Sequence, residues 1–325
     1  MGVYKVGVVI RKTRESLGIA RKELCDGICT IETLNRIENG QRTPNRATFQ
    51  ALMERMGKCG EKYFPYFNGP MDLLIMREDI SRLVGNRRYE EAERKLIELK
   101  KRINGNDKVN QQFVLREEAL IDYRMGRIDQ KEKRKRLIEA LKCTVPYYND
   151  EVMSRDFFSR GEILLFCNIA VSYAEENDLE KAINMLYQMK AYFDRSSIDL
   201  EERSISESFV LSNLEQCLGR NGEPEEAIKI ANKAIKLCLD YGKGISVPGL
   251  LFNVAYETRV LYGDTTLYRK RMAQAYYLAE INGNEYLMNH IKKDIQDNHG
   301  ICSFNQLVSS PKSCRDIESI IGQGE

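Results

Sequence analysis

Cysteine and histidine are among the residue types in this sequence that could bind a metal or act as nucleophile and base, and their spacing supports neither role. His290 and His299 lie far from most of the nine cysteines, no two cysteines form a CxxC pair, and no glycine-rich phosphate loop follows a strand. The sequence therefore predicts no catalysis, no metal and no cofactor. Most cysteines are expected to pack as small apolar side chains. They are Cys25, Cys29, Cys59, Cys143, Cys167, Cys217, Cys238, Cys302 and Cys314.

A second set of chemically capable residues lies in one short segment near the N-terminus. Thr30 has the side chain of a helix N-cap, because its hydroxyl can accept a hydrogen bond from a free amide in the first turn. In a helix from Ile31 to Asn39, Leu34 and Ile37 share the inner face. The residues left to the outer face or its flanks are Ile31, Glu32, Thr33, Asn35 and Arg36. Side chains of these types can contact base edges of DNA.

Two short helices and a turn are expected to position this segment. The first helix is indicated by residues at helical spacing, which are Gly7, Ile10, Arg14 and Leu17. Gly18 can end it in a left-handed conformation. A second helix is predicted over residues 20–25 with Leu24 pointing inward, followed by a turn over 26–29. Gly40 ends the third helix.

The segment RKELCDGICTIETLNRIENGQRTPN resembles the XRE-type, lambda-repressor-like helix-turn-helix, including the closing Arg-Ile-Glu-x-Gly and the following Pro44. In that family an arginine of the first helix pairs with the glutamate of the closing motif. The resemblance therefore implies a structural pair of Arg14 and Glu38. It also implies that the second helix of the motif lies in the major groove of double-stranded DNA.

The same resemblance implies which side chains contact DNA. They are Arg21, Thr30, Ile31, Glu32, Thr33, Asn35, Arg36, Gln41 and Arg42. Arg21, Gln41 and Arg42 would hold phosphates, while base edges carry the discrimination. Glu32 is the least typical, because phosphates repel a carboxylate unless it accepts from a cytosine amino group; it either tunes selectivity or faces solvent. The alternative interpretation is that residues 31–36 form a solvated helix face.

Length, charge and composition fit a small basic module joined to a larger body. Of the 325 residues, 42 % are hydrophobic and 30 % charged, and no run approaches the length of apolar residues that a membrane span needs. Residues 1–66 hold 12 Lys and Arg against 7 Asp and Glu, a charge of +5, so the rest carries −3 of the total of +2. The basic module favours contact with a polyanion. The N-terminus lacks a basic leader and a cleavage site, so a cytoplasmic location without a membrane partner is expected.

The segment 63–70, YFPYFNGP, has the composition of a domain boundary, because its two prolines and glycine end a helix and permit a turn. The predicted domains are an XRE-type helix-turn-helix over 1–66, a repeat domain over 67–300 and a tail over 301–325. Beyond the boundary the sequence shows only amphipathic stretches of helical period. The predicted fold class is therefore all-α.

Three segments of the repeat domain look alike, and each opens a helix after a polar turn. They are residues 89–92, 179–182 and 224–227, and the alanines that close them are 90 and 45 residues apart. A degenerate copy is expected over 131–141 and a fifth over 267–279. Residues 168–182, NIAVSYAEENDLEKA, resemble a tetratricopeptide repeat, which implies a right-handed α-solenoid of about five such repeats with a concave inner face. The basic run 131–136, KEKRKR, is interpreted as a solvated helix face.

Three consecutive copies carry asparagine at one position of their first helices, which faces the concave groove in tetratricopeptide repeats. They are Asn168, Asn213 and Asn253. An asparagine amide can donate to and accept from one peptide unit, so the row is a candidate site for an extended peptide. Val171, Gln216 and Tyr256 would supply side-chain pockets, and Arg116, Arg124 and Arg160 would anchor a carboxylate. The alternative is a chance coincidence of asparagines on solvated helix faces.

An XRE-type module followed by such repeats resembles the RRNPP group of peptide-sensing bacterial transcription regulators. Residues 27–29 are similar to that group's motif, and the asparagine row resembles its peptide contacts. The resemblance implies a homodimer on a near-palindromic operator, controlled by a short signalling peptide in quorum sensing. Two alternatives stay open: the repeats bind a protein partner instead, or they regulate a phosphorelay enzyme. The helix-turn-helix argues against the second, because its groove-facing residues would then have no role.

Overall fold

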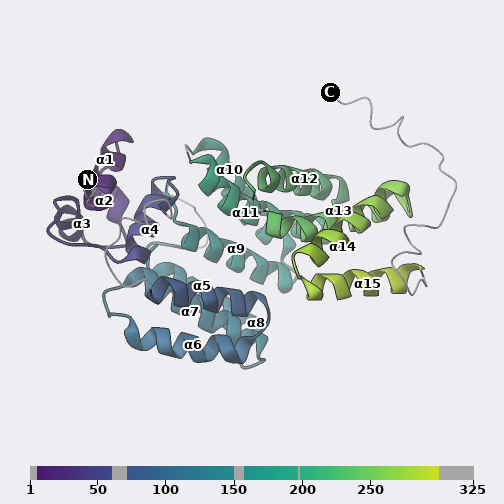
Figure 1. Cartoon of the computed structure of the whole chain (residues 1–325), viewed down its shortest axis with the longest axis horizontal. Coiled ribbons are helices and arrows are strands. Elements are labelled where there is room, and N and C mark those ends of the chain that lie inside the picture. Colours follow the sequence, from purple (N-terminus) through teal and green to yellow (C-terminus); the bar gives the residue numbers. More distant parts are fainter. Residues whose placement is uncertain (1–5, 61–71, 150–156, 197, 243, 300–325) are drawn as a thin grey trace. The chain divides into compact units, whose positions relative to one another are not determined.

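The computed structural model describes residues 6–60, 72–149, 157–196, 198–242 and 244–299 (Figure 1). Every regular element in these ranges is a helix, as predicted. They belong to two compact units, which divide between Asn213 and Leu214 inside one helix. None of the described helices is long and apolar enough to cross a membrane. The predicted boundary at 63–70, the tail 301–325 and the last two cysteines lie outside the described residues.

Four short helices form the N-terminal bundle. They are α1 (Val6–Ser16), α2 (Arg21–Cys25), α3 (Ile31–Glu38) and α4 (Arg46–Arg55). Gly18 has a φ of 69° and Gly40 a φ of 71°, so both follow their helices in the left-handed conformation that was predicted for Gly18. The side chain of Asn45 caps α4 by accepting a hydrogen bond of 2.7 Å from the amide of Thr48. The helices α1, α3 and α4 are thus begun or ended by residues suited to those positions.

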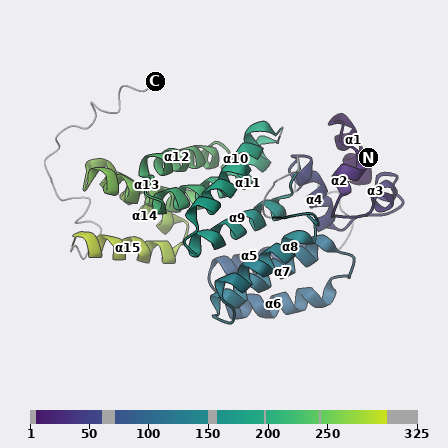
Figure 2. The ribbon, with the colours of Figure 1, turned by 180° about the vertical axis from the view of Figure 1, so that it is seen from behind.

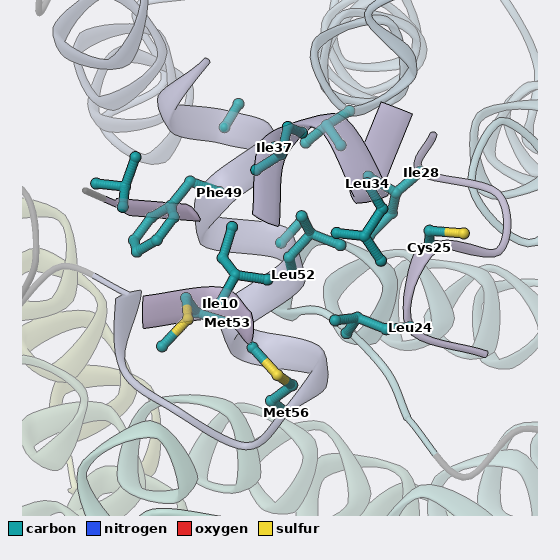
Figure 3. Close-up of a cluster of buried hydrophobic side chains, with 14 of the residues drawn as sticks. Ile10, Leu24, Cys25, Ile28, Leu34, Ile37, Phe49, Leu52, Met53 and Met56 are labelled. Carbon is teal, nitrogen blue, oxygen red and sulfur yellow. The ribbon is translucent and has the colours of Figure 1, made fainter. Parts of the chain in front are cut away.

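The core of this bundle is apolar and fully enclosed. Figure 3 shows Leu24 of α2, Leu34 and Ile37 of α3 and Leu52 of α4 in this cluster, and all four are buried. The same cluster includes Val109, which lies on α7 (Lys108–Arg124) of the repeat region. The helix-turn-helix core is therefore completed by a residue from outside the bundle.

The rest of the described chain consists of five consecutive helix pairs and one further helix (Figures 1 and 2). The pairs are α5 (Asp72–Gly85) with α6 (Tyr89–Arg102), α7 with α8 (Gln130–Lys142), α9 (Arg160–Glu175) with α10 (Leu179–Arg195), α11 (Leu200–Arg220) with α12 (Pro224–Asp240), and α13 (Val247–Tyr262) with α14 (Thr266–Ile281). A 3-10 turn, η2 (Gly244–Ser246), precedes α13, and α15 (Glu285–His299) follows α14. The helices α6, α10 and α12 begin at the residues where the look-alike segments begin.

The turn inside each pair contains one residue at positive φ. These residues are Arg87 at 61°, Gly126 at 72°, Asn177 at 69°, Gly222 at 79° and Gly263 at 74°. In the first four pairs this residue is the second one after the first helix ends, and this recurrence is the backbone counterpart of an internal sequence repeat. In the fifth pair Gly263 directly follows α13, and its ψ of −157° differs from that of a left-handed helical residue. Ala92, Ala182 and Ala227 are each the fourth residue of the second helix and are completely buried. A small side chain there allows the paired helices to approach closely.

The fourth residue of α8 is Lys133, and here the prediction of a solvated face for the basic run was wrong, although Lys131 and Lys135 are exposed as predicted. Lys133 is only 4 % exposed, its Nζ binds Glu175 and lies 3.9 Å from the centre of the Tyr123 ring. Burial lowers the pKa of this lysine, and the hydrogen bond to Glu175 opposes that shift. Arg134 is also largely buried and pairs with Glu176. Two charges of the run therefore face neighbouring helices, because the helix register turns position 133 inward.

Each unit has its own repeat core. In the first unit, α5, α6 and α7 share a cluster around Ile80, Leu96 and Phe113. In the second unit, α13, α14 and α15 pack around Leu251, Met272 and further apolar residues.

Candidate nucleic-acid interface and the polar residues of the repeats

The outer face of α3 presents the predicted DNA-contacting side chains to solvent. Thr30 caps the helix, accepting a hydrogen bond of 3.1 Å from the amide of Thr33. Glu32, Asn35 and Arg36 are exposed and Thr33 is half-buried. Ile31 is 49 % exposed at the first helical position, so an apolar side chain stands beside polar ones. This mixture suits contact with base edges and thymine methyl groups.

The predicted pair of Arg14 and Glu38 is present, and Arg21 joins it. Arg14 donates from Nε to Oε1 of Glu38 at 2.6 Å and from Nη2 to Oε2 at 3.0 Å, and it also binds the carbonyl of Ile19 at 3.0 Å. Arg21 donates from Nε to Oε2 of Glu38 at 2.6 Å. The hydrogen bond to Glu38 raises the pKa of Arg14. One buried carboxylate thus ties α1 and α2 to the end of α3.

Arg21 was predicted to bind a phosphate of DNA. In the structure its guanidinium group already binds Glu38. Its side chain remains about a third exposed, so it borders the surface as well as the cluster. Gln41 and Arg42 follow Gly40 in the exposed segment, and both of their amides donate to the carbonyl of Arg36. These two side chains therefore lie at the C-terminal end of the exposed helix.

One buried arginine, which was not predicted as a functional residue, binds the turn between α2 and α3 on its inner side. Arg55 of α4 donates to the carbonyls of Leu24 and Asp26, to the carbonyl of Thr144 at 3.1 Å, and to both carboxylate oxygens of Glu162. Burial alone would raise the pKa of Glu162, but Arg55 and the hydrogen bonds from Thr144 and Ser159 together outweigh burial, and the pKa is lowered. The sequence did contain a sign that Arg55 is buried. Arg55 lies three residues after Leu52 and directly before Met56, so it shares the helix face of these apolar residues.

Gly27 places the same turn directly against the repeat region. A Cβ at this position would stand 1.9 Å from the carbonyl oxygen of Thr144, and φ is 74°. Further along α4, Glu54 accepts from the amide of Arg160 at 2.8 Å. Lys58 binds Asp199 at 2.7 Å, and the amide of Asp199 donates to the carbonyl of Gly57. The helix-turn-helix is therefore joined to α9 and to the start of α11 by buried and half-buried polar contacts.

The three asparagines have different surroundings. Asn168 on α9 is half-buried and makes no side-chain hydrogen bond with the described residues. Asn213 on α11 donates to the carbonyl of Phe209 at 2.7 Å. Asn253 on α13 donates to Glu215, a contact that the sequence analysis did not anticipate. Beside them, Val171 is half-buried while Gln216 and Tyr256 are exposed. Each amide keeps capacity for another hydrogen bond.

The three arginines proposed as carboxylate anchors are also not equivalent. Arg160 binds Glu202 at 2.7 Å and lies 3.6 Å from Glu54, and Arg116 binds the neighbouring Glu117. Both guanidinium groups thus have internal carboxylate partners. Arg124 is exposed at the end of α7 and lies 5.7 Å from the centre of the Tyr123 ring. Of the three, Arg124 is the most accessible to an external carboxylate.

Comparison with known proteins identifies the N-terminal module. Residues 10–64 match the helix-turn-helix family HTH_3. The chain has a helix-turn-helix DNA-binding domain. No protein of curated function matches the sequence. The described residues contain no group of three or more His, Cys, Asp and Glu side chains arranged to hold a metal ion.

Solved structures share the fold over most of the chain. PlcR from Bacillus thuringiensis, in complex with the peptide PapR7 and DNA, superposes with a TM-score of 0.60 at 19 % identity, covering 88 % of this chain and 98 % of that one. Its apo form gives 0.56 at 18 % identity, with 90 % and 99 % covered. ComR from S. thermophilus, in complex with DNA and its signalling peptide ComS, gives 0.50 at 15 % identity, with 91 % and 100 % covered. These matches confirm the predicted combination of a helix-turn-helix with tetratricopeptide-like repeats.

Proposed function

We propose that this chain is a cytoplasmic transcription regulator that binds a specific operator through α3 and is controlled by a short signalling peptide bound by the repeat helices. One observation carries the proposal: the exposed face of α3 belongs to a helix-turn-helix that is followed by a repeat fold shared with PlcR and ComR. Each of those two proteins was crystallised with DNA and a peptide. Dimers of helix-turn-helix proteins bind two half-sites of a near-palindromic operator, and we propose that this chain acts as such a homodimer.

The peptide would act through the polar residues of the first helices. Asn168, Asn213 and Asn253, with Val171, Gln216 and Tyr256, are the proposed peptide contacts, and Arg124 is the preferred anchor for its carboxylate. To alter DNA binding, the peptide must bind one arrangement of the protein more tightly than another. The contacts of Arg55 and Gly27 with the repeat region supply a physical connection between the two functions.

Operator binding is tested with purified full-length protein and labelled DNA from upstream of its own and neighbouring genes. Affinity should fall steeply with salt, because lysine and arginine contacts displace condensed counterions. Asn35→Ala and Arg36→Ala should each weaken binding to the selected site by about tenfold. Arg94→Ala, an exposed arginine on α6, is the matched control and should have no effect. Equal affinity for all sequences, or an equal loss in the control, contradicts the proposal.

Peptide control is tested with synthetic peptides encoded by short open reading frames beside the gene. Asn168→Ala, Asn213→Ala and Asn253→Ala should each weaken the response of operator binding to peptide while helical content stays unchanged. An unchanged response in all three variants would remove the asparagine row from the proposal. The absence of any peptide effect on wild-type protein would remove peptide control itself.

A further inference from the structure

Two buried glutamates in the second unit lack the basic partner that every other buried glutamate of the described residues has. Among the described residues eight glutamates are buried. Six of them form ion pairs with arginine; they are Glu38, Glu54, Glu117, Glu162, Glu202 and Glu207. The other two, Glu215 of α11 and Glu257 of α13, pair with no basic side chain in the described part of the chain. A buried carboxylate without a cation is unfavourable, so these two are the exception to explain.

The two carboxylates converge on the same stretch of the two helices. Glu215 and Gly219 are one helical turn apart on α11, and Asn253 and Glu257 are one turn apart on α13. Asn253 donates from its amide to Oε1 of Glu215. Oε1 of Glu257 lies only 2.2 Å from where a Cβ of residue 219 would stand. The glycine therefore leaves the room that the second carboxylate fills.

The arrangement leaves hydrogen-bond acceptors without donors. Oε2 of Glu215 and both oxygens of Glu257 receive no hydrogen bond from the described residues, although Glu215 is 2 % and Glu257 8 % exposed. Burial raises the pKa of both groups, to about 8 for Glu215, where the charge of Glu257 adds to the effect. The nearby Arg259 is directed elsewhere, because it pairs with Asp294 at 3.5 Å and lies 5.3 Å from the centre of the Tyr256 ring.

We propose that Glu215 and Glu257 together bind a guanidinium or ammonium group of the signalling peptide, with Asn253 orienting Glu215. A guanidinium offers five donors in a planar fork, which matches two convergent carboxylates better than any neutral group does. This assignment rests on the proposed peptide-sensing function and adds the chemistry of the ligand. Gln216 and Tyr256 are exposed beside these residues in sequence and would border the bound group.

The cation site is tested first without any peptide. Full-length protein carrying glutamate labelled with 13C at the carboxyl carbon is titrated with n-butylguanidinium, and n-butylurea serves as the neutral probe of the same shape. The cation should shift two carboxyl resonances saturably, and the urea should not. Glu215→Gln and Glu257→Gln assign the two signals. Glu280→Gln, on an exposed position of α14, is the control. No saturable shift, or equal shifts with both probes, overturns the site.

The source of the cation is tested with two pools of random hexapeptides, one with a fixed arginine and one with citrulline in its place. Wild-type protein should retain the arginine pool about tenfold better, because a charge-assisted pair replaces a neutral contact. The double variant Glu215→Gln/Glu257→Gln should retain both pools equally. Equal retention of both pools by wild-type protein overturns the assignment to a peptide cation. Retention of neither pool, with the guanidinium titration intact, contradicts peptide sensing and leaves the cation site standing.

Discussion

Replacing Arg55 by methionine should destabilise the first unit more than any exposed substitution. The change leaves the carboxylate of Glu162 buried without a counter-charge, which costs about 3 to 5 kcal/mol. The carbonyls of Leu24, Asp26 and Thr144 each lose a charged donor as well, so the total loss is about 4 to 6 kcal/mol. That is comparable with the whole unfolding free energy of many domains.

The assay is urea denaturation followed by far-UV circular dichroism, since every described regular element is helical. The double variant Arg55→Met/Glu162→Gln removes the stranded charge and should recover about 2 kcal/mol of the loss. Arg11→Met breaks an exposed pair with Glu15 and should leave the midpoint unchanged. A loss below about 1 kcal/mol in Arg55→Met, or strictly additive effects in the double variant, would refute the reasoning.

Three further predictions concern single positions. Gly27→Ala should reduce the free energy of unfolding by at least about 2 kcal/mol, seen as a lower melting temperature, because φ is positive and a Cβ would clash with the carbonyl of Thr144. Gly105→Ala is the control and should be nearly neutral, because a Cβ there meets open space. Glu38→Gln should cost about 3 kcal/mol in urea denaturation and reduce operator affinity, because Arg14 and Arg21 lose their common counter-charge; unchanged stability would contradict this. Glu215 has a pKa of about 8 instead of 4.5, so wild-type stability should fall as pH rises from 4.5 to 8, by on the order of 4 kcal/mol. Glu215→Gln should remove that fall, and parallel pH profiles of the two proteins would argue against it.

The sequence was sufficient to predict the elements whose signals are local. The cap at Thr30, the inward Leu34 and Ile37 and the left-handed Gly18 all follow from residue type and helical spacing, and the structure has each of them. The first residues of α6, α10 and α12 could also be predicted, because each of these repeat copies has a polar turn followed by an alanine at the same position.

Contacts between segments that are far apart in the sequence could not be predicted from residue type and spacing. Arg55 and Glu162 are 107 residues apart, and neither is unusual within its own helix. Lys133 was assigned to solvent because the charge of a run says nothing about which of its members the helix turns inward. Asn253 was predicted only as a peptide contact, because a single sequence does not reveal that Glu215 lies close enough to accept its hydrogen bond.

The inclusion of Val109 in the core of the N-terminal bundle has a consequence for exchanging parts between regulators. A transplant of residues 1–60 alone would remove Val109 from this core and separate Arg55 from Glu162. It would also place Gly27 against a different protein surface in place of Thr144. A functional chimera would have to carry the matching faces of α7, α8 and α9 with it. New operator specificity is therefore more readily obtained by changing the outward residues of α3 than by replacing the whole module.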